Sequence, residues 1–275
     1  MAHFVTEDAP QPSVDPAAQG VVTLSGVKAH SVDFVGGKGA GLERMMTAGL
    51  SVPTTFCVTT AVFERAISRI LRDVSGYQDL LEALRTYTFP AELRAAIASC
   101  MEEIDVSEWA VRSSATDEDS IQLSFAGQQI SRLHVQGVDA VCAAIREVWA
   151  SLFAEDALMY RANHDGEDLI PSSIAVLLQP MLDPIAAGVL FTRDPTGHPR
   201  DCVISATEGI GTSVVEGRGG TTYYIERKSG YVRRTEGAQN PLSAPQIQRL
   251  STLAEQLDGL FEAPLDVEWA LVRDD

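Results

Sequence analysis

The stretch Trp109–Gln129, WAVRSSATDEDSIQLSFAGQQ, begins as a buried type of strand and then changes character. Three apolar residues lead into Arg112, and two serines and an acidic cluster follow it. An arginine at the end of an apolar strand does not build core, so its guanidinium has another group to hold. The planar fork of arginine suits two oxygens of a phosphate. Pairing with the nearby carboxylates, which would only fix the loop, is an equally open interpretation.

The end of the same stretch, SFAGQQ, places Gly127 between small and polar residues. A glycine at this point lets the backbone lie against a ligand. A β-bulge or hairpin glycine explains the pattern equally well.

A glycine-rich segment, GGKGAG at Gly36–Gly41, lies upstream of this strand. Its four glycines surround Lys38 at the predicted start of a helix, where backbone N–H groups favour an anion. The segment is not a P-loop, because position 32 is valine and Gly39 stands where a serine or threonine is required. Two interpretations stay open: a phosphate-binding turn with Lys38 as a point charge, or a plain helix start with a solvated lysine.

The last strand-like segment, LDVEWALV, carries two acids at alternate positions. Alternation puts Asp266 and Glu268 on one face of the strand and the apolar residues on the other. Such a pair can hold a hard cation such as Mg²⁺ beside phosphate oxygens, although acids that simply face water fit the pattern equally well. A weaker signal is Gln179 in LLQPM, which could hydrogen-bond the edge of a base.

Composition limits the classes of partner. The 275 residues carry a formal net charge of −17, which argues against nucleic acid or an anionic membrane as the main partner. The sequence has no apolar run of about 20 residues and no signal-peptide pattern, so we expect a cytoplasmic protein. The four cysteines stand far apart, which is typical of buried, reduced thiols.

Patterning along the chain predicts three regions: a flexible N-terminal tail at 1–20, a helix-rich first lobe at 21–177 and a strand-rich second lobe at 178–275. In the first lobe the helical pattern from residue 61 to 103 breaks near Gly76 and at Pro90. In the second, Ser243 and Gln246 have the spacing of a capping box that opens a helix ending near residue 261. We expect a cleft between the lobes.

The motifs together, in their order along the chain, resemble the N-terminal ATP-binding domain of the phosphoenolpyruvate-utilising phosphotransferases. This group includes phosphoenolpyruvate synthase, pyruvate phosphate dikinase and rifampin phosphotransferase. The resemblance runs from about residue 21 to the end, and it rests on GGKGAG, VPTTFCVTT, AVRSSATDEDS, SFAGQQ, LLQPM, GVLFTRDP, GIG and LDVEWAL.

The resemblance implies an α+β, two-lobed, ATP-grasp-like domain that encloses Mg·ATP. It implies that Lys38 and Arg112 hold the phosphates, with Gly127 in the phosphate-binding turn. Gln179 would border the adenine, while Asp266 and Glu268 would bind Mg²⁺, with Glu268 also contacting the nucleotide. The phosphoryl group would pass to a histidine on a carrier domain or partner protein, and from there to a small-molecule acceptor.

Three departures from the family pattern affect the expected activity. The chain ends at LVRDD, before the family's Gln-x-Arg pair, and neither Gly-Gly pair leads to a carrier histidine. Thr212 stands where the family has an acidic residue after its GLG turn. We therefore expect that complete turnover needs further sequence. Two alternatives are an ATP-dependent ligase or condensing enzyme that forms an acyl phosphate, and a non-catalytic nucleotide-binding module.

Overall fold

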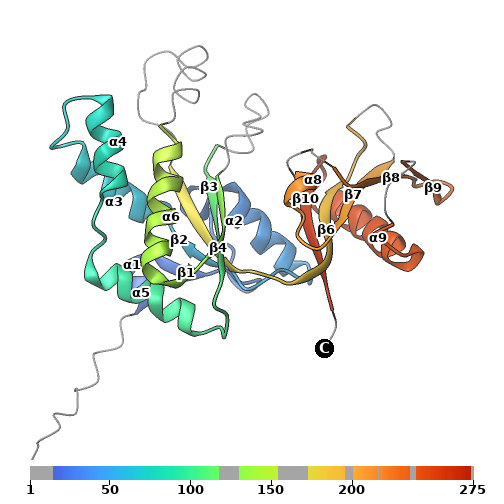
Figure 1. Cartoon of the computed structure of the whole chain (residues 1–275), viewed down its shortest axis with the longest axis horizontal. Helices are drawn as coiled ribbons and strands as arrows, with labels where there is room; N and C mark the ends of the chain where they lie inside the picture. The colour runs from blue at the N-terminus through green and yellow to red at the C-terminus, as the bar shows by residue number, and fades with distance from the viewer. Residues whose placement is uncertain are drawn as a thin grey trace, which may run out of the picture. The chain divides into compact units, whose positions relative to one another are not determined.

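The chain divides into two compact units, residues 1–181 and 182–275, and each contains one five-stranded antiparallel sheet (Figure 1). The computed structural model describes residues 15–117, 130–153, 173–195, 201–215, 217, 219–235 and 240–273. The predicted lobe boundary at residue 178 falls inside strand β5 (Ile174–Pro180), which belongs to the first sheet. The mixture of helices with two antiparallel sheets confirms the α+β class.

The first unit is built on a sheet in the order β1-β2-β5-β3-β4. The longest pairing joins β3 to β5 and runs from Trp109↔Pro180 to Ala115↔Ile174. Because neighbouring side chains on a strand point to opposite faces, each strand contributes to two different layers. The other three strands are β1 (Val21–Thr23), β2 (Phe56–Val58) and β4 (Ser131–Val135), and β3 spans Trp109–Ala115.

The larger core lies on the face of this sheet that is covered by four helices, namely α3 (Thr60–Ile70), α4 (Tyr77–Arg85), α5 (Ala91–Glu102) and α6 (Gly137–Ser151). Trp109, Val111 and Leu178 from the strands pack there with fully buried Trp149 of α6. Gly76 and Pro90 occupy the N-cap positions of α4 and α5. These positions confirm both predicted breaks in the helical pattern.

Helix α2 (Val32–Thr47) covers the opposite face of the sheet, so that α2 and α6 flank the strands (Figure 1). The core under α2 is small: Val35 packs with Cys57, Leu177 and a few apolar neighbours. Of the predicted N-terminal tail, residues 1–14 lie outside the described residues. Pro16–Gln19 form the short helix α1, and the Arg65 guanidinium donates a hydrogen bond to the Gln19 carbonyl oxygen.

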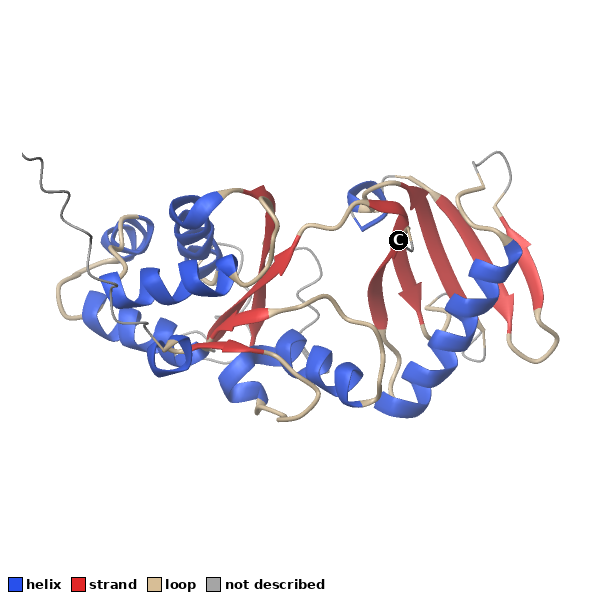
Figure 2. Cartoon of the chain, turned by 90° about the horizontal axis from the view of Figure 1, so that it is seen from below, coloured by secondary structure: helices blue, strands red, loops and turns tan. Residues whose placement is uncertain are grey.

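The second unit has its sheet in the order β10-β6-β7-β8-β9. Helix α9 (Ala244–Phe261) lies along one face of this sheet (Figure 2). The predicted capping box is confirmed, with both the Ser243 and the Gln246 side chains bonded to the backbone. The remaining elements are β6 (Pro184–Phe191), β7 (Cys202–Glu208), α8 (Thr212–Val215), β8 (Thr221–Glu226), β9 (Tyr231–Arg234) and β10 (Asp266–Val272).

Asp258 connects α9 to residues that follow two strands of the sheet. Its carboxylate accepts hydrogen bonds from Arg193 Nε at 2.7 Å and from Arg227 Nη1 at 3.1 Å. Burial alone would raise the pKa of this carboxyl, but the hydrogen bonds and charges of Arg227 and Arg193 outweigh burial, and the pKa is lowered. Both arginines therefore hold α9 in place through one ionised acid.

All four cysteines are buried free thiols, which confirms the prediction made from their spacing. Burial raises the pKa of each thiol, and for Cys57 the nearby Glu43 carboxylate raises it further. Among the described residues, no helix combines the length and the apolar character needed to cross a membrane.

Candidate functional site

The glycine-rich segment bends helix α2. Gly36 has φ 73° and ψ 172°, so the helical course is interrupted there and resumes with Gly37. The predicted helix does start in this segment, after Gly36, but a short helical stretch that begins at Val32 already precedes it. Gly36, Gly37 and Gly39 are all buried, and Gly36 and Gly39 lie against the sheet, at Ser114 and Leu177 respectively.

Ser114 of β3 occupies the kink. Its hydroxyl donates a hydrogen bond to the Val35 carbonyl oxygen at 2.8 Å and accepts one from the Gly39 N–H at 3.0 Å. In an uninterrupted helix the Gly39 N–H would bond the Val35 carbonyl directly. The serine is thus inserted into the backbone ladder of α2, which is a recognised cause of a sharp bend. Ser114 is fully buried.

Arg112 lies on the same face of the sheet as Ser114. It pairs with Leu177 of β5, which belongs to the core under α2. Residues two apart on a strand share a face, so Arg112 and Ser114 both lie on the α2 side. Lys38 directly precedes Gly39, whose N–H donates a hydrogen bond to the Ser114 hydroxyl. The structure therefore brings the Lys38 turn and the Arg112 strand together on one face of the first sheet.

Gln179 is on this face as well, because its pair with Ala110 lies two positions along the strands from the Arg112↔Leu177 pair. Its amide nitrogen donates a hydrogen bond to Thr55 Oγ1 at 2.9 Å, and the Thr55 hydroxyl donates to the Pro53 carbonyl at 2.8 Å. This chain of bonds holds the Gln179 side chain against the segment that enters β2. Gly127, the predicted residue of the phosphate-binding turn, lies outside the described residues.

A buried acid, which the sequence did not single out, fixes the approach to α2. Glu43 is 1% exposed, and its carboxylate accepts the His30 backbone N–H and contacts His30 Nδ1, both at 2.7 Å. The Thr47 hydroxyl donates to the Glu43 carbonyl at 2.9 Å and contacts the Gly26 carbonyl at 3.2 Å. The segment before α2 is therefore bonded to the second part of the same helix.

We expect Glu43→Ala to lower the free energy of unfolding of the first unit by about 2 to 4 kcal/mol, because it leaves two part-buried donor groups of His30 without their acceptor. Urea denaturation followed by tryptophan fluorescence measures this loss. The matched control is Glu64→Ala on α3, where the glutamate is exposed and a change within about 0.5 kcal/mol is expected. Equal stability of the two variants would contradict a structural role for the Glu43 carboxylate.

The two predicted metal ligands lie on β10 in the second unit. Asp266 and Glu268 are exposed, while Val267, Trp269 and Leu271 between and beyond them are partly buried. The predicted alternation is confirmed. Asp266 pairs with Phe191 and Glu268 with Val189, on the face opposite the one that α9 covers. Within the described ranges, no group of three or more His, Cys, Asp and Glu side chains is arranged to hold a metal.

Residues 32–237 match the family described as the AMP/ATP-binding domain of pyruvate phosphate dikinase. The chain belongs to this family. The matched part of the AMP/ATP-binding domain includes the kink in α2, Arg112 and Gln179, and it ends before Asp266 and Glu268. The family assignment also confirms the ATP-grasp-like class of the fold.

Curated relatives of this AMP/ATP-binding domain are long proteins. The prodigiosin synthesizing transferase PigC of Serratia marcescens is 36% identical over 93% of the chain, and the rifampicin phosphotransferase of Bacillus cereus is 32% identical over 92%. The phosphoenolpyruvate synthase of Pseudomonas aeruginosa is 32% identical over 93%. The matches cover 32%, 34% and 40% of these proteins, so the domain spans about a third of their length.

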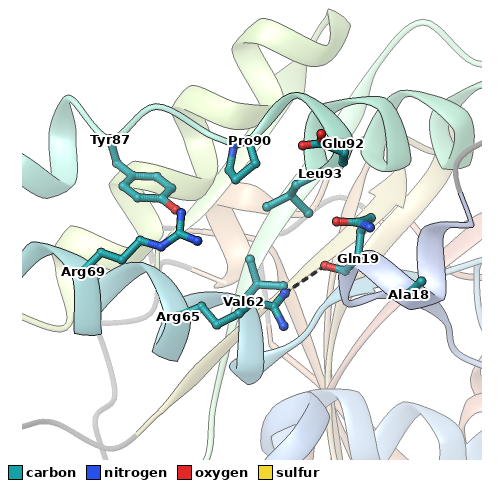
Figure 3. A pocket seen from close by; sticks show the side chains of 9 residues that line it. All are labelled: Ala18, Gln19, Val62, Arg65, Arg69, Tyr87, Pro90, Glu92 and Leu93. Carbon is teal, nitrogen blue, oxygen red and sulfur yellow. Dashed lines mark hydrogen bonds between the residues drawn. The ribbon is translucent and has the colours of Figure 1, made fainter.

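A pocket of about 260 Å³ in the first unit of this AMP/ATP-binding domain is lined by residues of α1, α3 and α5 (Figure 3). It lies on the side of the sheet opposite the face that carries Arg112. Val62 and Leu93, two of its lining residues, belong to the core on the other side of the sheet. Arg65 and Arg69 of α3 border the pocket and are exposed. The pocket is therefore separate from the candidate site, and its cations are solvated rather than buried.

Proposed function

We propose that this chain binds Mg·ATP and serves as the nucleotide-binding domain of a phosphotransferase. In this proposal, a phosphoryl group passes from ATP to a carrier histidine on further domains or a partner. The carrier then delivers it to a small-molecule acceptor. The proposal rests on one observation. The turn that contains Lys38 and the strand that contains Arg112 meet on one face of the first sheet, where the buried Ser114 of that strand is hydrogen-bonded to the turn.

The chemistry of phosphoryl transfer fits these residues. Such a reaction needs little from covalent groups of the protein, and it depends on positioning and on neutralising negative charge. We assign Lys38 as a point charge for the phosphates and Arg112 as a fork for two of their oxygens. Gln179 is proposed to border the base. In a chain with a net charge of −17, cations held on one structured face are a local exception that suits a polyanion.

For the metal we propose Asp266 and Glu268 as Mg²⁺ ligands, with Glu268 also contacting the nucleotide. Their residue type fits, because Mg²⁺ prefers oxygen ligands and is ordinarily bound by one or two carboxylates together with phosphates and water. The two carboxylates lie at alternate positions on one face of β10, and both residues are exposed. Bound Mg²⁺ would neutralise charge that develops on the phosphates.

The proposal also includes a carrier histidine, a small-molecule acceptor and a cytoplasmic location. The rifampicin phosphotransferases and phosphoenolpyruvate synthases among the relatives support a small-molecule acceptor. The acidic net charge supports neither nucleic acid nor a membrane surface as a partner. Four free, buried thiols support a cytoplasmic location.

Labelling with radioactive ATP tests the reaction in a protein that contains this chain and the downstream sequence. We expect the label on a histidine, in a form that acid removes and base preserves. Label in an acyl phosphate, which base hydrolyses, would instead support a ligase. If the longer protein bound Mg·ATP but transferred no phosphoryl group to a histidine or to any acceptor, the phosphotransferase proposal would be wrong and a non-catalytic module would be supported.

The metal assignment is tested on the chain itself by calorimetric titration with Mg·ATP. The double variant Asp266→Asn, Glu268→Gln is expected to weaken the Mg²⁺-dependent part of ATP binding by about tenfold or more, because two charged ligands are lost. Glu255→Gln on α9, also an exposed acid of the second unit, is the matched control and should bind normally. An unchanged Mg²⁺ dependence in the double variant would exclude this pair as the ligands.

A further inference from the structure

The Ser114 hydroxyl connects strand β3 to helix α2 by hydrogen bonds. Ser114 is 0% exposed, and both of its side-chain hydrogen bonds go to the backbone of α2 rather than to its own strand. The acceptor is Val35 and the donor is Gly39, so the two bonded groups enclose Gly36, Gly37 and Lys38. One side chain therefore holds both ends of the short segment that contains the lysine.

The bond to Gly39 has the geometry of a helix cap supplied by another element. Because the helical course resumes after Gly36, Gly39 is the third residue of the resumed helix. The N–H at this position is one that an N-cap side chain ordinarily accepts. Gly36 has no side chain, and the Ser114 hydroxyl of β3 accepts the N–H in its place. The cap thus ties the start of the Lys38 helix to the strand that carries Arg112.

Ser113 provides an internal comparison. It is also a nearly buried serine, at 5% exposure, but alternation turns it to the opposite face of β3. There Trp109, Val111 and Ala115 belong to the large core under the helices. A buried serine without a specific role would not be expected to direct both of its side-chain hydrogen bonds to the backbone of α2. The bonds of Ser114 are directed to the proposed phosphate-binding segment.

We propose that Ser114 is a positioning residue for the phosphates of ATP, which sets the spacing between the Lys38 turn and Arg112 without touching the base. This inference rests on the proposed binding of ATP by the first unit. Hydrogen bonds in a buried, low-dielectric setting are strong and hold geometry closely. Loss of this hydroxyl should therefore loosen the phosphate contacts and leave the contacts of the nucleoside as they are.

The test compares Ser114→Ala with Ser113→Ala in the chain, using calorimetric titration of Mg·ATP and NMR titration of adenosine. We expect Ser114→Ala to weaken Mg·ATP binding about tenfold, the scale of one lost helix cap, while adenosine binding stays within about twofold. The Gly39 amide should also exchange with solvent faster. Ser113→Ala should leave both affinities and the Gly39 exchange rate unchanged.

Two results for Ser114→Ala would overturn the inference while leaving ATP binding intact: unchanged Mg·ATP affinity, or an equal loss for Mg·ATP and adenosine, which would indicate general destabilisation. An equal loss of Mg·ATP affinity in Ser113→Ala would do the same. If the unmodified chain does not bind Mg·ATP at all, the proposed function fails, and this inference fails with it.

Discussion

Gly36→Ala is expected to lower the free energy of unfolding of the first unit by about 3 to 5 kcal/mol, from backbone strain and overpacking combined. A Cβ at this position would lie 2.0 Å from the Ser114 carbonyl oxygen and 2.4 Å from its carbonyl carbon. Those atoms belong to the backbone of β3, which is paired on both sides and cannot withdraw. The φ of 73° with ψ of 172° adds strain, because this region is accessible essentially to glycine alone.

Gly41→Ala, five residues along the same helix, is the matched control. A Cβ there meets no heavy atom within 4 Å, and alanine is the better helix former. The free energy of unfolding should stay the same or rise by about 0.5 to 1 kcal/mol. Urea denaturation monitored through Trp109 and Trp149, both in the first unit, measures the two variants. Comparable stabilities would contradict the tight contact between α2 and β3.

Local signals in the sequence were enough to predict several elements. Gly76 and Pro90 end one helical pattern and open the next, because both residues disrupt a helix by backbone chemistry alone. The capping box at Ser243 is likewise a matter of residues three apart. Alternation along Asp266–Val272 follows from the geometry of any strand. None of these needs information about distant contacts.

The kink in α2 could not be predicted in this way. Its cause is Ser114, which is 75 residues from Gly39 in sequence and reaches α2 only through the packing of the sheet. The glycines of GGKGAG do indicate close backbone contact. They do not indicate whether the backbone meets a ligand or another strand, and for Gly36 it meets a strand.

Glu43 shows a second limit. A helical pattern read from the apolar residues places Leu42, Met45 and Met46 on one side of the helix. Leu42 and Met46 do pack against the core under α2, but all three residues are only partly buried, whereas Glu43 is fully buried. The carboxylate tolerates this burial because His30, thirteen residues earlier, supplies its hydrogen bonds. Hydrophobic periodicity cannot anticipate a polar residue whose partner lies outside the helix. A glutamate on the apolar side of a helix, with a histidine just before that helix, was the available signal.

Arg112→Ala is expected to weaken Mg·ATP binding by about 100-fold or more, because a bidentate, charge-assisted contact to phosphate is among the strongest single interactions. In a longer protein that carries the phosphohistidine, transfer from ATP should be abolished. Arg112 is half-buried beside Leu177, on the same face as the Ser114-bonded turn of α2. Calorimetry gives the affinity, and circular dichroism verifies that the fold persists.

Arg132→Ala is the matched control for this experiment. Arg132 lies on the adjacent strand β4 but pairs with Val111, and its Nε contacts the Glu147 carboxylate of α6, so it faces the other side of the sheet. Removing this exposed pair should cost at most about 1 kcal/mol of stability and leave ATP binding unchanged. Arg112→Lys keeps the positive charge but removes the planar guanidinium. It should recover only part of the affinity for Mg·ATP, because an ammonium cannot bind two phosphate oxygens in the same way. Full ATP affinity in Arg112→Ala would remove Arg112 from the site and, with it, the main support for phosphate binding on this face.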